Sequence, residues 1–499
     1  MPIPKEILDV KRPTNTVVVA YGKNKDRYAV RKRVGCKNVN GRHIPINGPT
    51  IGHIVNYKYV PIDAATLSNI SIAPIDIKDW ANVVLCNNVF KNVQLELMSV
   101  YSTQDMLKLY CISILRVCFP GIKDNELKEA YETTFLSELY PDVPLSKNTV
   151  SSFMNNLGKA SSRIVQFMRK RTAAVKMDHH LLVDRTLKPD ESKVNSLSDF
   201  SWKAKVRGSR DISVLYAFDL ETMEPVCSKC FPGNRLDVTS YEAFIAENGI
   251  TQGIIVADKG FPSSAAEKQF KKHPNLHYLN PIKRNSRLIE RHKLLEYTGV
   301  LSGFEFITFR KEKCNEVNKW LYSYRDSVKA AKEEQVWFHQ VKKEGTYDPK
   351  EHQKRRLRFG TIVLECDLDL PPEIVYKSYS KRWEIELVMR YYKSACEFDE
   401  NRVHDDYSVI GSEFCDFLST VLTFRLINVF DKVKLLEQIP YKKVMSILAR
   451  AKKARFKSND WQLVRISPSN EKILQKVGGL EAPSMPPKRK RGRPKKSAI

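Results

Sequence analysis

Short runs of alternating apolar and polar residues lie between Thr16 and Pro61, and Gly, Asn and Asp separate them. The stretch TVVVAYGKNKDRYAVRKRVG, which begins at Thr16, shows the pattern. A period of two residues is typical of half-buried β-strands, and turn residues between the runs favour hairpins. Lys and Arg crowd the same segment. The pattern therefore predicts a small basic β module over residues 1–62.

Beyond Asp63 the apolar spacing becomes that of helices, and plausible N-caps open segments at Asp105, Asp124 and Ser146. The third segment has apolar residues at i, i+3, i+4 and i+7, and Gly158 lies near its expected end. These apolar residues are Val150, Phe153, Met154 and Leu157. With the preceding helix the segment could form a helix-turn-helix, although core packing in a bundle fits slightly better. We predict a helical DNA-binding domain over residues 63–176.

The order of elements from His179 predicts the fold class. Strands are expected at residues 180–184, 212–219, 224–231, 253–258 and 276–282, and helices at 238–248 and 263–272. Three strands followed by helix, strand, helix and strand is the order of a ribonuclease-H-like α/β core. Fold order alone leaves function open.

The remaining boundaries follow changes in composition. Residues 177–285 form the first part of the expected core, and residues 286–370, with mixed β-like runs and basic stretches, form a β-rich insertion. A long helix is expected from Pro371, because Pro suits the first turn of a helix. It opens a second core segment, residues 371–435. A helical region, 436–480, and a basic tail, 481–499, complete the prediction.

The charge of the chain indicates a polyanionic partner. Lys and Arg number 83 against 57 Asp and Glu, a formal net charge of +26. Such an excess favours nucleic acid first and an anionic membrane surface second. The longest apolar run, residues 417–430, is interrupted by Arg425 and is too short to span a bilayer. Residues 1–10 lack the apolar core of a secretory signal, so a cytosolic protein without membrane contact is expected.

Two aspartates follow apolar runs at predicted strand ends, Asp184 after LLV and Asp258 after IIVA. Sites in open α/β sheets tend to form at the carboxyl ends of strands. A lone Asp at this place is commonly a turn or helix cap, but two of them make a metal site credible. Cys227 and Cys230 are the only cysteines three positions apart, and in a strand they would face opposite sides, so reduced cysteines partly used as small core residues are expected instead of a metal site.

The long helix carries four polar residues on one side. At about 100° per residue, all four project within an arc of roughly 60°. They are Tyr379, Arg382, Glu386 and Lys393. An ordinary solvated face with an Arg to Glu pair at i, i+4 is the alternative interpretation.

The spacing Tyr-x2-Arg-x3-Glu-x6-Lys of these residues resembles the YREK signature of DDE transposases from bacterial insertion sequences. The surrounding strings YSKRWEIELVMRYYKS, IIVADKGF and CFPGNRLD are also similar to that family, over residues 181–430. The resemblance implies a ribonuclease-H-like core with Asp184, Asp258 and Glu386 as catalytic metal ligands for two Mg²⁺ or Mn²⁺ ions. One departure is Arg185, which stands where many relatives have a small residue.

The resemblance also implies the function. An insertion-sequence transposase would cut double-stranded DNA at the inverted repeats of its element and join the freed 3′-hydroxyl to target DNA. It would act as a homodimer on paired ends, in the cytoplasm of a bacterium or archaeon and associated with the nucleoid. Tyr379, Arg382 and Lys393 would contact DNA phosphates. A ribonuclease-H-fold nuclease without joining activity, and a non-enzymatic DNA-binding protein derived from a transposase, are the alternatives.

Three further features of the sequence are candidates for a functional role. The tail contains RGRP at Arg491, Gly492, Arg493 and Pro494, which resembles an AT-hook for the minor groove of A·T-rich DNA. A generic basic tail is the alternative. Trp320 and Trp337 could stack on a flipped base, but core packing is the better interpretation for both. Asp237 is expected to cap a helix rather than bind metal.

Overall fold

The computed structural model describes most of the chain, and side chains within it are described except at 39, 42, 237–238, 257, 267, 344, 384, 386–396 and 456. The described ranges are 3–22, 26–39, 42–62, 75–190, 192, 194–200, 209–235, 237–257, 267–315, 318–396, 405–456 and 460–477. The chain divides into two compact units. The first consists of residues 1–77 and 454–462, and the second of residues 78–453 and 463–499.

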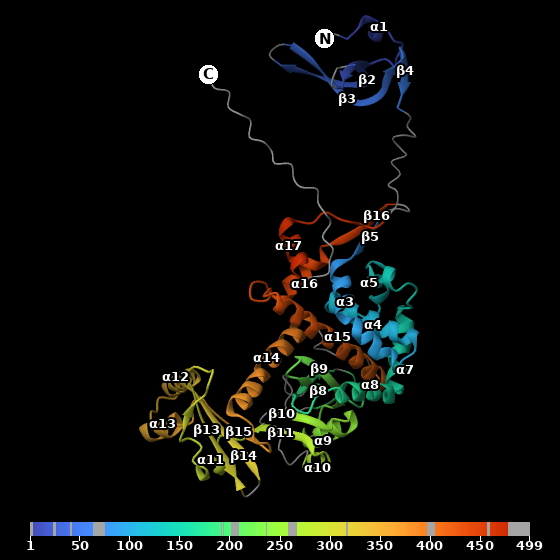
Figure 1. Cartoon of the computed structure of the whole chain (residues 1–499). Coiled ribbons are helices and arrows are strands. Elements are labelled where there is room, and N and C mark those ends of the chain that lie inside the picture. The colour runs from blue at the N-terminus through green and yellow to red at the C-terminus, as the bar shows by residue number, and fades with distance from the viewer. Residues whose placement is uncertain are drawn as a thin grey trace. The chain divides into compact units, whose positions relative to one another are not determined.

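The first unit is built on a four-stranded antiparallel sheet in the order β1-β2-β3-β4. Its elements are α1 (Lys5–Leu8), β1 (Thr16–Tyr21), β2 (Arg27–Val39), β3 (Arg42–Val55) and β4 (Lys58–Pro61). Ile7, Val18, Val30 and Ile54 form a small buried core. The alternating runs seen in the sequence between Thr16 and Pro61 correspond to these strands (Figure 1).

Helices form one layer of the second unit (Figure 1). They are α3 (Ala81–Met98), α4 (Thr103–Cys118), α5 (Leu127–Glu132), α6 (Leu136–Leu139), α7 (Lys147–Lys159), α8 (Ser161–Ala173), α15 (Asp406–Lys432), α16 (Tyr441–Ala449) and α17 (Pro468–Lys476). Helix α15 is buried along most of its length and packs against α3, α4, α7 and α8. Among the described residues, no helix is both long and apolar enough to span a membrane. Outside the two larger sheets, the remaining described strands are short: β5 (Ile75–Asp79), β16 (Lys452–Phe456) and β17 (Gln462–Leu463).

Two glycines allow α7 and α15 to pack with their backbones close together. A Cβ on Gly158 would overlap the carbonyl group of Tyr407, and a Cβ on Gly411 would overlap that of Met154. Because only glycine lacks a Cβ, a larger residue at either position would push the helices apart.

A large mixed sheet forms the other layer, in the order β12-β13-β14-β15-β11-β10-β6-β8-β7, with β9 paired to β8. Its strands are β6 (His180–Pro189), β7 (Asp199–Phe200), β8 (Arg210–Asp219), β9 (Glu224–Pro232), β10 (Gln252–Ala257), β11 (Asn275–Pro281), β12 (Gly299–Val300), β13 (Ile307–Cys314), β14 (Lys319–Asp326) and β15 (Thr361–Cys366). Strands β6, β10 and β11 are mutually parallel, and the other pairings are antiparallel. The fold is therefore mixed α/β, as the sequence predicts.

Different helices cover the two faces of this sheet. Tyr216 of β8 stacks on Phe417 of α15, with ring centroids 6.4 Å apart. Leu215 directly precedes Tyr216 in the strand and therefore faces the opposite side of the sheet. Its cross-strand partner, Lys229 in β9, forms an ion pair with Glu247 of α9 (Asp237–Asn248). Helix α15 thus covers one face and α9 the other.

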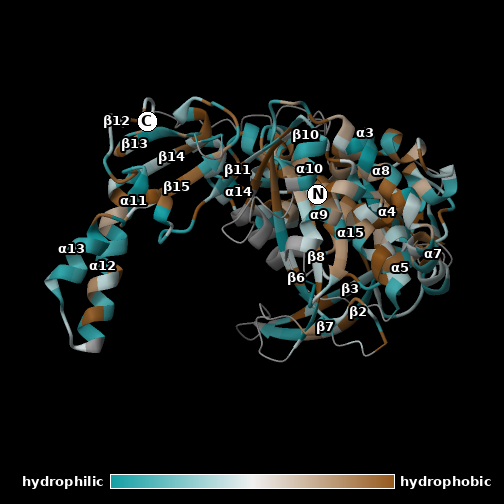
Figure 2. Ribbon diagram, turned by 90° about the horizontal axis from the view of Figure 1, so that it is seen from below, coloured by the Kyte–Doolittle hydropathy of each residue, from teal (hydrophilic) through white to brown (hydrophobic). Residues whose placement is uncertain are grey.

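The insertion differs from the β-rich segment expected at residues 286–370. It contains β12 to β15 but also α11 (Arg287–Arg291), α12 (Ser327–Glu344) and α13 (Pro349–Arg356). Helix α13 is hydrophilic, as Figure 2 shows, and it buries no side chain. Because β15 pairs antiparallel with β11, the insertion extends the central sheet rather than interrupting it.

Buried charges join the sheet to the helical layer. The Lys188 ammonium in β6 lies 2.6 Å from Glu413 Oε1 and 3.0 Å from Asp416 Oδ2, both in α15. Arg116 of α4 donates to Asp416 over 2.7 Å. Burial alone would lower the pKa of Lys188, but the two carboxylates outweigh it and hold that pKa well above its ordinary value. Lys188 therefore stays charged inside the protein.

Replacing Lys188 with Met should destabilise the second unit strongly. The substitution keeps much of the volume but leaves Glu413 buried without a cation, a loss that costs about 3–5 kcal/mol. Lys128→Met is the matched control, because the Lys128–Glu132 pair is 60% and 57% exposed and such pairs contribute about 0–1 kcal/mol. Thermal unfolding measured by calorimetry should show the difference. Equal shifts for the two variants would contradict a structural role for the network.

Candidate catalytic site

Asp184 lies in β6 and is partly buried. The sequence predicts it at the end of the first strand, and this is wrong, because β6 continues to Pro189. The apolar run ends at Val183, but pairing with β8 goes on from Asp184 opposite Tyr216 to Pro189 opposite Asp211. The polar half of the strand is held by this ladder and by the buried contacts of Lys188.

Asp184 shares a sheet face with α15, and Arg185 does not. Cross-strand partners point to the same face, so Asp184 lies on the face of Tyr216, which stacks on α15. Arg185 points to the other face, where its guanidinium donates to the carbonyl oxygens of Gly233 and Arg235 over 3.0 Å and 3.3 Å. The unusual arginine therefore does not share the face of Asp184.

Strand β10 runs parallel to β6, next to Asp184. Its last residue, Ala257, pairs with Val183. Asp258, the second predicted ligand, follows directly in the sequence but lies outside the described residues. The expected strand 253–258 is present as Gln252–Ala257.

The predicted long helix is α14 (Pro372–Cys396), which packs against β10, β14 and α15. Tyr379 is 6% exposed, and its hydroxyl accepts a hydrogen bond of 3.0 Å from Arg382 Nη1. Glu386 and Lys393 lie in the same helix, but their side chains are outside the described part of the chain. The structure thus joins Tyr379 to Arg382, and of the three predicted carboxylates it describes only that of Asp184.

The other candidate residues either pack inside the protein or lie in segments that the structure does not describe. Trp337 is 7% exposed and stacks on His352 at 4.8 Å, so its core-packing interpretation is confirmed. Trp320 is partly buried, with the Lys311 ammonium 4.6 Å from its ring centroid. Residues 491–494 lie outside the described residues, and Asp237 begins α9 with its side chain not described.

Cys227 and Cys230 are both free cysteines in β9, and Cys227 is fully buried. Burial raises the pKa of both thiols above the ordinary value. Buried thiols of high pKa are inert, so the prediction of a small core residue is confirmed for Cys227, whereas Cys230 is partly buried.

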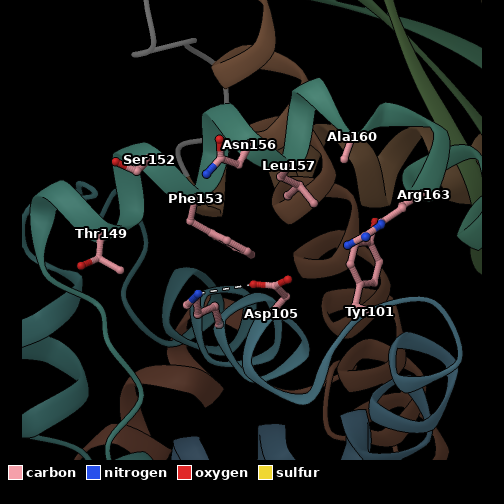
Figure 3. A pocket seen from close by; sticks show the side chains of 10 residues that line it. Tyr101, Asp105, Thr149, Ser152, Phe153, Asn156, Leu157, Ala160 and Arg163 are labelled. Carbon is pink, nitrogen blue, oxygen red and sulfur yellow. Dashed lines mark hydrogen bonds and ion pairs between the residues drawn. The ribbon is translucent and has the colours of Figure 1, made fainter.

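Helix α7, the possible recognition helix, uses its apolar side for packing. Val150, Phe153, Met154 and Leu157 are at most 7% exposed, which confirms the favoured core-packing interpretation. A cleft of about 300 Å³ lies between α7, α4 and the start of α8. In Figure 3, Phe153 and Leu157 point into this cleft, and a dashed line joins Asp105 to Lys108 at 3.4 Å.

A group of residues of the types that can bind a metal ion, which the sequence does not predict, lies at the start of β6 and the end of β8. Ligand atoms of His179, Asp219 and Glu221 all lie within 4.8 Å of one another. His179 Nδ1 is 2.7 Å from Asp219 Oδ2, and Glu221 accepts from the His180 amide over 2.7 Å. Asp219 also accepts from the Glu221 amide over 2.8 Å, so these groups already stabilise the turn between β8 and β9.

This group is separate from Asp184. His179 precedes Asp184 by five residues, about 16 Å along an extended strand. The set contains the nitrogen and oxygen donors that a divalent cation accepts. The only sequence signal was the pair His179-His180 before an apolar run and the Asp-x-Glu string after β8.

Residues 176–408 match the family described as Transposase DDE domain. A similar solved structure is the piggyBac transposase synaptic complex with hairpin DNA, determined by cryo-EM, which is 14% identical and is matched over 81% of this chain and 83% of that chain. Its TM-score is 0.39. No curated protein matches the chain.

Residues 176–408 therefore form a transposase DDE domain, and the resemblance noted in the sequence is confirmed over this segment. The matched range contains Asp184, Asp258, Glu386 and the rest of the Tyr-Arg-Glu-Lys string. This domain supports a DDE-type nuclease or transposase enzyme.

Replacing Glu221 with Gln should lower stability at neutral pH, and the effect should shrink in acid. Burial would raise the pKa of Glu221, but hydrogen bonds from the His180 ring and amide outweigh it and lower the pKa. A carboxylate with a lowered folded pKa contributes stability above its unfolded pKa, about 4.3, and loses it as pH falls through the folded pKa. Thermal unfolding of both proteins across pH 7 to pH 3 tests this. Glu132→Gln, on an exposed helix, is the control, and a difference that grew in acid would contradict the assignment.

Proposed function

We propose that the protein is the transposase of an insertion sequence, with a ribonuclease-H-like catalytic core. The DDE domain over residues 176–408 supports the general class. The order β9-β8-β6-β10-β11 supports the core, since two antiparallel pairings are followed by two parallel ones. This is the arrangement expected from three consecutive strands followed by two strands that helices connect.

The observation that carries the proposal is the register of β10 on β6. Ala257 pairs with Val183, so one further step of the same ladder would pair Asp258 with Asp184. Residues in register on parallel strands point to the same face, which here is the face covered by α15. Two carboxylates from neighbouring strands would then meet on one face of the sheet.

The geometry of α14 supports Glu386 as the third ligand. Glu386 follows Tyr379 by seven residues, an angular offset of only about 20° on a helix. Tyr379 and Ile385 are buried in the core of the unit, and α14 packs on β10. On this geometry Glu386 would face the sheet next to the proposed pair of aspartates.

The donor set of the proposed site fits hard divalent cations. Three carboxylates are the ligands that Mg²⁺ or Mn²⁺ prefers, and they suffice for two ions together with phosphate and water. Two such ions, when bound, activate the attacking oxygen and stabilise the leaving oxygen of a phosphodiester. Asp184, Asp258 and Glu386 would hold them.

The proposed reaction has two phosphoryl-transfer steps. Water attacks the phosphodiester at the element end, a new P–O bond forms, and the bond to the 3′-oxygen breaks to leave a 3′-hydroxyl. That hydroxyl then attacks a target phosphodiester and displaces a target 3′-hydroxyl. Arg382, oriented by its hydrogen bond with Tyr379, and Lys393 would neutralise phosphate charge near the scissile bond.

The wider assembly follows from this reaction. Double-stranded DNA is the partner, as element ends and as target, and a homodimer would hold two ends together. The net charge of +26 supports such a partner. The RGRP string of the tail would lie in the minor groove as an AT-hook, and the protein would act on the nucleoid of a bacterial or archaeal cytoplasm.

Neutral replacements of the three carboxylates should abolish Mg²⁺-dependent cleavage and strand transfer. Asp184→Asn, Asp258→Asn and Glu386→Gln keep side-chain shape but remove the charge that holds the metal pair. Their losses should be comparable, because members of one catalytic unit do not contribute additively. Cleavage and joining are assayed on DNA that carries the element's own end, with Mg²⁺ and with Mn²⁺.

Glu221→Gln is the matched control, since it neutralises a carboxylate of the separate His179 group. It should leave cleavage intact. Robust cleavage by Glu386→Gln would refute the proposed site, and loss of activity in Glu221→Gln alone, in protein that is still folded by thermal melting, would move the metal to the His179 group. Cleavage without joining by the unmodified protein would favour the nuclease alternative.

Removing residues 481–499 should weaken DNA binding while cleavage at saturating DNA survives. Each lost phosphate contact reduces the slope of log affinity against log salt by about 0.9. Binding to A·T-rich and G·C-rich duplexes over a salt series measures the effect. A larger loss on A·T-rich DNA is expected of an AT-hook, whereas equal losses would indicate a generic basic tail.

A further inference from the structure

Strands β2 and β3 continue beyond the rest of their sheet as a two-stranded ribbon (Figure 1). The last β1 pairing is Thr16 with Lys32, and β4 pairs only with residues 52–55 of β3. Beyond these pairings, Arg33 lies opposite Asn47 and residues 35–39 lie opposite residues 46–42, and here the two strands pair with no other described strand. Six residues per strand give a ribbon about 20 Å long. We call this segment the β2–β3 ribbon.

Side chains on both faces of the ribbon are exposed. Residues 31–38 and 43–47 are all exposed, and they include apolar side chains that a monomeric β unit normally covers. Val34 is 58% exposed, Ile44 42% and Ile46 42%. The small core of the unit, around Val30 and Ile54, is formed by residues outside the ribbon. The ribbon therefore contributes little to the folding of its own unit.

The ribbon lies in a segment without a single acidic residue. Residues 27–62 contain no Asp or Glu. The same segment contains seven cations, which are Arg27, Arg31, Lys32, Arg33, Lys37, Arg42 and Lys58. A protein partner would normally meet both signs of charge, whereas a surface of one sign matches a polyanion.

The register of β2 on β3 places different kinds of side chain on the two faces of the ribbon. Lys37 pairs with Ile44 and Gly35 with Ile46, so these residues share one face. Asn38 pairs with His43, and Cys36 with Pro45, on the other face. One face thus offers Lys37 beside apolar groups, and the other offers the side chains of Asn38 and His43, with Arg33 opposite Asn47 on the same side. Such a mixture suits contact with both phosphates and base edges.

We infer that the β2–β3 ribbon enters the major groove of duplex DNA, an inference that rests on the proposed function. Two strands about 4.8 Å apart fit a groove about 12 Å wide, which admits a two-stranded ribbon. Arg33 and Lys37 would contact phosphates along the groove, and Ile44 and Ile46 would meet base edges such as thymine methyl groups. Pro45 and Pro49 in β3 lack amide donors, which disfavours the addition of a protein strand at its outer edge.

The test compares binding by the full chain of a mixed-sequence DNA duplex and of an RNA duplex of the same sequence. Arg33→Ala and Lys37→Ala should each lower the slope of log affinity against log salt by about 0.9 on DNA. Ile44→Gln should weaken binding to DNA without changing that slope. On RNA all three effects should be smaller, because the major groove of an A-form duplex is too deep and narrow to enter.

Lys58→Ala is the matched control. It removes one exposed cation from the same sheet, beside the turn between β3 and β4 and away from the ribbon. It should change DNA binding less than Lys37→Ala does. Fluorescence anisotropy over a salt series supplies all the affinities, and thermal melting verifies that each variant is folded.

Several outcomes overturn the inference. Equal losses of affinity on DNA and RNA, or equal losses for Lys58→Ala and Lys37→Ala, would mean that the cations attract nucleic acid non-specifically and that the ribbon has no special role. Ribbon variants that bind DNA normally but change the oligomeric state would make the ribbon a protein contact. If the unmodified chain cleaves DNA and ribbon variants bind like it, only this inference fails. If the unmodified chain binds through the ribbon but never cleaves, the proposed function fails instead.

Discussion

The buried contact of Lys188 with Glu413 and Asp416 is the interaction on which the second unit depends. It joins β6, the strand of Asp184, to α15, and Arg116 carries the contact on to α4. Burial of these charges is costly, so only a geometry that pairs them is stable. Lys188 follows Asp184 by four residues on one face of the strand. The same contact that positions the helices therefore also fixes the strand that carries the candidate ligand.

Local patterns in the sequence predict much of this fold. Apart from the end of β6, the strands predicted between residues 180 and 282 lie close to their predicted bounds, as does α9, and α7 buries the four apolar residues that its spacing indicated. The errors arise where stability comes from distant partners. The second half of β6 is polar. It is a strand because its backbone pairs with β8 and because carboxylates of α15 pair with its buried Lys188. Pairing of β15 with β11 joins segments more than eighty residues apart, which no local pattern reveals.

Local patterns in the sequence also predict only part of the candidate site. Asp184 and α14 could be chosen from the sequence because a family resemblance supplied the spacing. The His179 group had no such signal. Its members become neighbours only because β6 pairs antiparallel with β8, which brings Asp219 opposite Leu181. Residues about forty positions apart thus converge through strand pairing, and the sequence alone does not specify that register.

Alternation along β6 also explains how the chain accommodates Arg185 beside Asp184. A guanidinium next to a metal-binding carboxylate in space would compete with the cation for its oxygens. In a strand, however, successive side chains point to opposite faces. The guanidinium of Arg185 is held by the carbonyl oxygens of Gly233 and Arg235, on the side of the sheet opposite α15. The face of β6 that carries Asp184 is therefore the same as it would be with a small residue at position 185.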